Sequence, residues 1–240
     1  MVKNEKLCSL LITECFGTEN FSDTLLKSLT PAQLVMISCC MYYESELQKG
    51  IARGEKWVYT NSNIYAYQHS TFDHMVESGK HGTNCAMPAG WAFIDMGMLE
   101  EGMRFWGDKT RGLCNYEKLS QYIDPCCNVY FRTGEKFCEL YEGWHVRPGD
   151  VFMGKGHTFV YLGDEKFLAA GHDGKWHRDD SVADITEDTK HAVFDSWFCD
   201  MKTCGNYEYS VFWQISLKED YIPEFYRNKN GKIEKVPDDL

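Results

Sequence analysis

The sequence has no long apolar run and no surplus of basic residues. A membrane-spanning helix needs about 18 or more consecutive apolar residues, and no such run occurs, so we expect no membrane partner. The formal net charge is -11, which disfavours nucleic acid because a phosphate backbone is bound by clustered Lys and Arg. A neutral or cationic substrate fits this composition better.

We also expect no signal peptide and no disulfide framework. The apolar run from Leu7 to Ile12 is short, it is soon followed by Glu14, and no small-residue cleavage site comes after it. We therefore expect a protein that is cytoplasmic or is released without a signal peptide, as in phage lysis or injection. The 11 cysteines are odd in number and irregularly spaced, which predicts reduced thiols.

Closely spaced metal ligands are absent, since the chain has no Cys-x-x-Cys and no His-x-x-x-His. Cys199 and Cys204 are five residues apart, as are His172 and His177, and this spacing is weak evidence for zinc. We expect no metal and no cofactor.

Local signals predict helices in the first half of the chain and strands in the second. Thr30-Pro31-Ala32-Gln33 carries a capping hydroxyl, a proline at the first helical position and a glutamine at the third. Short apolar runs separated by glycines predict strands over 151–153, 158–162 and 166–170, and alternation predicts a longer strand over 207–216. The expected fold class is α+β, with N-terminal helices packed on an antiparallel β-sheet.

The 240 residues suffice for one sizeable core. We expect a helical extension over 1–55 that packs on this core, a main domain over 56–220, and a polar C-terminal tail over 221–240 with no role beyond a terminus.

One cysteine and one histidine stand in positions that suit nucleophilic chemistry. Cys85 falls at the predicted start of a helix, which Pro88 supports because proline is tolerated only in the first turn. His157 falls at the predicted start of a strand. A helix N-terminus favours a thiolate and an imidazole can accept the thiol proton, so we predict that these two residues are catalytic.

The same segments resemble the NlpC-type papain-like cysteine peptidases, which are bacterial or phage cell-wall hydrolases. The resemblance rests on the region around Cys85 and on the run RPGDVFMGKGHTFVYLGDEKFLAAGH from Arg147 to His172. In that family a "PGD" turn leads through a strand to the base histidine, at the head of a segment like "HVGIYLG". The resemblance implies a papain-like NlpC-type fold for residues 56–220, with an insertion near 103–142.

Other positions depart from the family pattern. The family usually has Asp-Cys-Ser-Gly at the nucleophile, whereas this chain has Asn84-Cys85-Ala86-Met87. A polar residue that orients the base is expected about a dozen residues after it, but position 169 is alanine. His172, with Asp173 as the alternative, is the nearest substitute.

The oxyanion would be bound by the backbone N–H of Cys85. In the family an upstream tyrosine often assists, and three tyrosines are candidates here, namely Tyr59, Tyr65 and Tyr67.

The expected function is cleavage of an amide bond by thiolate attack, and the resemblance implies a peptidoglycan stem-peptide endopeptidase or amidase acting on a peptide or muropeptide substrate. A thiol acyltransferase or deamidase uses the same residues. A catalytically inactive binding module of the same fold is the other alternative. The sequence does not predict the oligomeric state.

Overall fold

The computed structural model describes residues 2–55, 57–59, 71–79, 81–101, 103, 116–136, 146–154, 157–164, 166–177, 189–198 and 210–237. The helices are α1 (Val2–Glu14), α2 (Asp23–Ser28), α3 (Pro31–Ala52), α4 (Phe72–Glu77), α5 (Met87–Asp95) and α6 (Tyr116–Ile123), with a short 3-10 helix at Thr18–Asn20. None of these described helices is long and apolar enough to cross a membrane.

The strands are β1 (Val58–Tyr59), β2 (Gly82–Thr83), β3 (Cys127–Lys136), β4 (Val151–Gly154), β5 (His157–Gly163), β6 (Lys166–His177), β7 (Thr189–Phe198), β8 (Ser210–Leu217), β9 (Phe225–Arg227) and β10 (Ile233–Lys235). The first eight of them form one sheet in the order β2-β1-β7-β6-β5-β4-β8-β3. The β1–β2 pair is parallel and the other pairs are antiparallel. The α+β class expected from the sequence is therefore confirmed.

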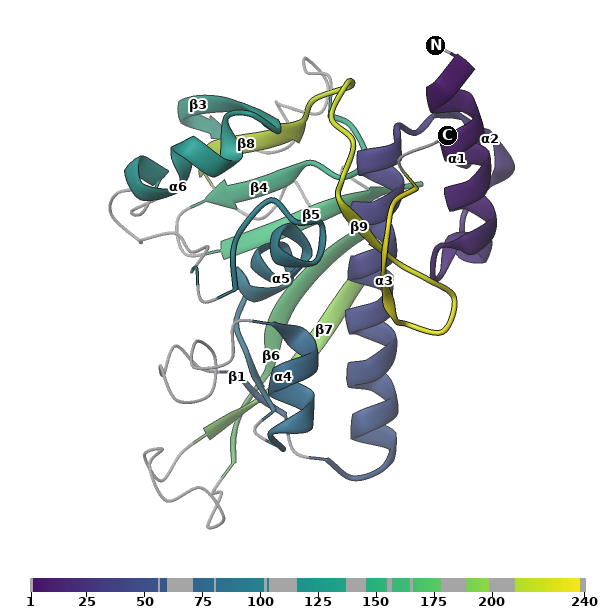
Figure 1. Cartoon of the computed structure of the whole chain (residues 1–240). Helices are drawn as coiled ribbons and strands as arrows, with labels where there is room; N and C mark the ends of the chain where they lie inside the picture. Colours follow the sequence, from purple (N-terminus) through teal and green to yellow (C-terminus); the bar gives the residue numbers. More distant parts are fainter. Residues whose placement is uncertain are drawn as a thin grey trace.

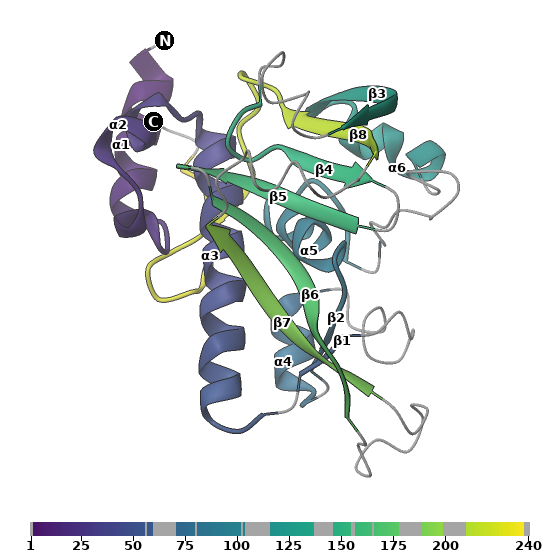
Figure 2. The same cartoon turned by 180° about the vertical axis from the view of Figure 1, so that it is seen from behind.

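The helices α3, α4 and α5 lie on one face of this sheet, in front of it in Figure 1 and behind it in Figure 2. The helices α1 and α2 lie beyond α3, away from the strands (Figure 1). Since α5 contacts both α3 and β6, it links the helical layer to the middle of the sheet.

Alternation along the strands separates two buried clusters. Val151, Val160 and Leu168 join the main core, which also contains residues of α3 and α5. Phe152 and Tyr161, next to them in sequence, belong to a second cluster with Phe167. Neighbouring strand residues point to opposite faces, so the second cluster lies on the face away from the helices.

Helix α3 begins where the sequence predicts and for the predicted reason. The Thr30 hydroxyl accepts a hydrogen bond from the Gln33 N–H at 3.3 Å, and the Gln33 side chain accepts one from the Thr30 N–H at 2.9 Å. This capping box, with Pro31 as the first helical residue, satisfies donors that a helix start otherwise leaves open. Leu34 and Leu47 are buried in the shared core, so α3 is part of the main packing unit.

The C-terminal segment differs from the plain polar tail that its composition suggests. Strands β9 and β10 pair as an antiparallel hairpin, drawn in yellow against α3 in Figure 1. Tyr226 and Val236 are buried in the main core, and the Arg227 carbonyl accepts a hydrogen bond from the Ser38 hydroxyl of α3 at 3.2 Å. The hairpin is thus an integral part of the packing.

Arg227 holds the hairpin in place. Its side chain is fully buried, and its Nε lies 2.6 Å from Asp95 Oδ2 while Nη2 lies 3.1 Å from Asp73 Oδ2. The Tyr43 hydroxyl donates to the same Asp95 oxygen at 2.5 Å. Burial raises the pKa of the Asp95 carboxyl above its ordinary value, and the bonds from Arg227 and Tyr43 offset this only in part. The four residues join β9 to α3, α4 and α5.

We predict that Arg227→Met lowers the free energy of unfolding by about 3–5 kcal/mol, because it leaves the Asp95 carboxyl buried without its cationic partner. Urea unfolding followed by tryptophan fluorescence measures this change. The control is Lys229→Met, an exposed position in the same hairpin, for which we expect a change below about 0.5 kcal/mol. An Arg227→Met protein as stable as the control would contradict the role of the ion pair.

Candidate functional site

Cys85 lies in a turn between the end of β2 and the start of α5. The Asn84 carbonyl accepts a hydrogen bond from the Met87 N–H at 3.2 Å, and the Asn84 side chain accepts one from the Ala86 N–H at 3.0 Å. Asn84 is buried, whereas Cys85 is half-buried. Helix α5 starts at Met87, with Pro88 in its first turn.

This arrangement follows from local sequence. An Asn side chain readily accepts a hydrogen bond from the backbone two residues on, which turns the chain out of β2. Pro88 then fits the first turn of the helix, where a backbone N–H would have no acceptor within the helix, so the lack of one in proline costs no hydrogen bond. Cys85 therefore stands two residues before the first residue of α5, at the end of the helix that carries the positive partial charge of its dipole.

The other described cysteines are placed differently. Cys15, Cys39, Cys40, Cys126 and Cys127 are buried, and burial raises the pKa of each of these thiols. Cys8 is half-buried, but its thiol donates to the Leu29 carbonyl at 3.5 Å, and burial raises its pKa as well. The inert form of a thiol is the protonated one, so among the described cysteines Cys85 is the best candidate nucleophile.

Strand pairing gives the backbone position of one of the three oxyanion candidates. Tyr59 pairs with Thr83 in the parallel β1–β2 ladder, two residues before Cys85. Tyr65 and Tyr67 lie outside the described residues. The backbone of Tyr59 thus lies beside the segment that leads to the candidate nucleophile Cys85.

His157 is the first residue of β5, as predicted, and pairs with Gly154 at the end of β4. The turn before β4 holds this hairpin in register. The Gly149 N–H donates to the Tyr161 carbonyl at 2.7 Å, and the Tyr161 N–H donates to the Asp150 carbonyl at 2.9 Å. Gly149 has a φ of 87°, which glycine adopts without the steric cost of a side chain.

Asp150 makes this turn a buried polar junction. Its Oδ2 accepts from the Arg147 N–H at 2.9 Å and from Gln214 Nε2 at 2.8 Å. Burial raises the pKa of the Asp150 carboxyl to about 6 from an ordinary 3.8, although these two bonds oppose the shift. Through Gln214 the carboxyl ties the turn before β4 to β8.

The strand order separates the segments of the two predicted catalytic residues, Cys85 and His157, by three strands. Cys85 follows β2, and His157 begins β5, with β1, β7 and β6 between these two strands. Helix α5 contacts β6, the neighbour of β5. The side chain of His157 lies outside the described part of the structure.

His172 and Asp173 lie in β6. His172 pairs with Ala192 of β7, and the pairing shifts between His172 and Trp176. The side chains of both candidate orienting residues also lie outside the described part.

Register adds one residue that sequence reasoning missed. Ala169, which occupies the position of the expected orienting residue, pairs directly with Asp195 of β7. Directly opposed residues in an antiparallel pair have neighbouring side-chain positions. The pairing of Ala169 with Asp195 could not be predicted from the sequence because it depends on the register between β6 and β7.

No group of three or more metal-ligating side chains occurs within the part of the chain that the structure describes. Of the weakly spaced pairs, Cys199 and Cys204 lie outside the described residues, and His172 and His177 are described only as backbone in β6.

Comparison of the chain with protein-family models, with curated proteins and with solved structures found no match.

The raised pKa of Asp150 predicts a pH-dependent stability. The folded protein keeps the proton up to about pH 6, whereas the unfolded chain releases it near pH 4. The stabilisation from this proton is therefore complete below pH 4 and is lost as the pH rises to about 6. One pKa unit corresponds to about 1.4 kcal/mol, so the loss amounts to at most about 3 kcal/mol.

Asp150→Asn should remove this dependence, since the amide is neutral at every pH and its nitrogen can donate to Gln214 Oε1, which has no partner among the described residues. We expect the stability of the natural protein relative to the variant to fall between pH 4 and pH 7, as measured by urea unfolding. The exposed Asp220→Asn is the matched control. Equal pH dependence of all three proteins would contradict the assignment.

Proposed function

We propose that the protein is a thiol hydrolase that cleaves an amide bond with Cys85 as its nucleophile. His157 accepts the thiol proton, and the Cys85 sulfur attacks the amide carbonyl to form a tetrahedral intermediate. Collapse of this intermediate breaks the C–N bond, and His157 gives the proton to the leaving amine. Water, activated by His157, then hydrolyses the thioester and releases a carboxylic acid.

The observation that carries the proposal is the position of Cys85. It is the half-buried cysteine at the turn into α5, whereas burial raises the pKa of the other described thiols. A reactive cysteine needs partial exposure and an electropositive surrounding, and the start of a helix supplies the second.

Supporting residues are proposed from the strand pairing. The oxyanion would accept a hydrogen bond from the Cys85 N–H, with help from Tyr59, whose backbone pairs with Thr83. His172 or Asp173 would orient the imidazole of His157. Asp195 is a further candidate for this role because it pairs with Ala169.

The proposed substrate class is a peptide of the bacterial cell wall, and it rests on the motif from Arg147 to His172. A peptidoglycan stem peptide or a muropeptide supplies the required amide. An acyltransferase would use the same thiolate, with an amine in place of water as the acceptor of the acyl group. A deamidase would use it on a primary amide, from which ammonia leaves.

The direct test incubates the protein with purified sacculi and with synthetic stem peptides in water enriched in oxygen-18. We expect new amine ends and new carboxyl ends that carry the label, detected by mass spectrometry. Cys85→Ser should lower the rate by at least about a thousandfold, whereas Cys8→Ser, at the other half-buried thiol, should leave it unchanged.

The outcomes separate the alternatives. Products that join the acyl group to an added amine, without the isotope, would indicate acyl transfer. Release of ammonia without backbone cleavage would indicate deamidation. Cleavage by Cys85→Ser at the natural rate would contradict the proposal.

A further inference from the structure

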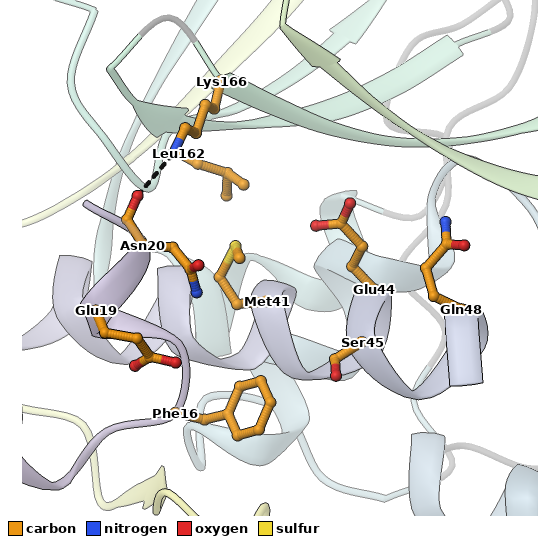
Figure 3. A pocket seen from close by; sticks show the side chains of 9 residues that line it. All are labelled: Phe16, Glu19, Asn20, Met41, Glu44, Ser45, Gln48, Leu162 and Lys166. Carbon is orange, nitrogen blue, oxygen red and sulfur yellow. Dashed lines mark hydrogen bonds between the residues drawn. The ribbon is translucent and has the colours of Figure 1, made fainter. Parts of the chain in front are cut away.

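A cavity of about 370 Å³ lies between α3, the segment before α2, and the β5–β6 turn, and none of its lining residues belongs to the β1, β2 or α5 region. Figure 3 shows the side chains that line it, which are Phe16, Glu19, Asn20, Met41, Glu44, Ser45, Gln48, Leu162 and Lys166. The volume falls in the lower part of the range for small-molecule sites.

The frame of the cavity is fixed by bonds between segments that are distant in sequence. Lys166 Nζ donates to the Asn20 carbonyl at 2.7 Å, and the Ser22 N–H donates to Asp164 Oδ2 at 3.1 Å. Both bonds attach the β5–β6 turn to the segment before α2. A ligand would therefore meet a preformed site and would not have to order it.

The charge in the cavity is negative and incompletely neutralised. Glu19 and Glu44 both line it, and neither has an ion-pair partner among the described residues. The cation Lys166 is held by the Asn20 carbonyl and lies 4.6 Å from the centroid of the Phe21 ring. The two carboxylates are thus open to a cationic ligand.

The space between the carboxylates is partly apolar. Figure 3 shows Glu19 and Glu44 on opposite sides of Met41, with the Asn20 amide between Glu19 and Met41 and with Gln48 beyond Glu44. Leu162 and Phe16 lie on either side of Met41 in the same view. An aliphatic chain would fit against these three side chains, because apolar surfaces associate with the release of water.

We propose that this cavity binds an elongated aliphatic diamine, with one ammonium group at Glu19, the other at Glu44, and the methylene chain against Met41. A diamine matches the two separated carboxylates and the apolar surface between them better than a compact cation does. The net charge of -11 adds a general attraction for such a ligand. This site is independent of the proposed hydrolase activity.

Isothermal titration of the full chain with cadaverine, an aliphatic diamine, tests the proposal. We expect one site per chain, and a loss of affinity of about threefold to tenfold in Glu19→Gln and in Glu44→Gln, as is typical of partly exposed ion pairs. Pentylamine, which has the same chain and one amine, should bind weaker by a similar factor. Raising the salt concentration should weaken binding further.

Two controls make the result decisive. Glu46 lies in the same helix as Glu44, but its carboxylate pairs with Lys49 and does not line the cavity. Glu46→Gln should therefore retain the natural affinity. Cys85→Ser should also retain it, which separates this site from the hydrolase proposal. No saturable binding at millimolar cadaverine, or equal weakening by Glu46→Gln and Glu44→Gln, would overturn the proposal; an unchanged melting temperature of Glu44→Gln confirms that the variant is folded.

Discussion

The ion pair between Arg227 and Asp95 holds the helical layer to the C-terminal hairpin. A fully buried guanidinium is tolerated only if carboxylates and carbonyls surround it, and here those groups come from α4, α5 and the hairpin itself. Tyr43 of α3 completes the group through the same carboxylate. Four segments are therefore placed relative to one another by one charged side chain.

The same ion pair bears on the candidate active site because Asp95 is the last residue of α5. Cys85 precedes the other end of this helix, where the turn at Asn84 sets its start. The helix is held at its end by Arg227 and along its length by contacts with α3 and β6. The turn that carries Cys85 therefore leads into a helix that is anchored at its far end and along its length, and nucleophilic attack depends on such positioning.

The features that could be predicted from the sequence depend on local signals. The features that could not be predicted depend on contacts between residues that are far apart in the chain. The Thr30–Gln33 capping box, the proline after Cys85 and the start of β5 at His157 each depend on a few neighbouring residues. Arg227 is the first residue of a polar run that follows Phe225 and Tyr226, and its partner Asp95 is 132 positions away, so no local pattern marks it as buried. The pairing of Ala169 with Asp195 likewise depends on a strand, β7, that local alternation did not reveal.

The proposed mechanism requires that His157 activates Cys85. The most direct measurement is the rate of Cys85 alkylation by iodoacetamide between pH 5 and pH 9, followed by peptide mass spectrometry with Cys8 as the internal reference. We expect Cys85 to react at pH 6 at least about tenfold faster than Cys8, and His157→Ala to remove most of this advantage. A Cys85 that reacts no faster than Cys8, at a rate that His157→Ala does not change, would contradict the account.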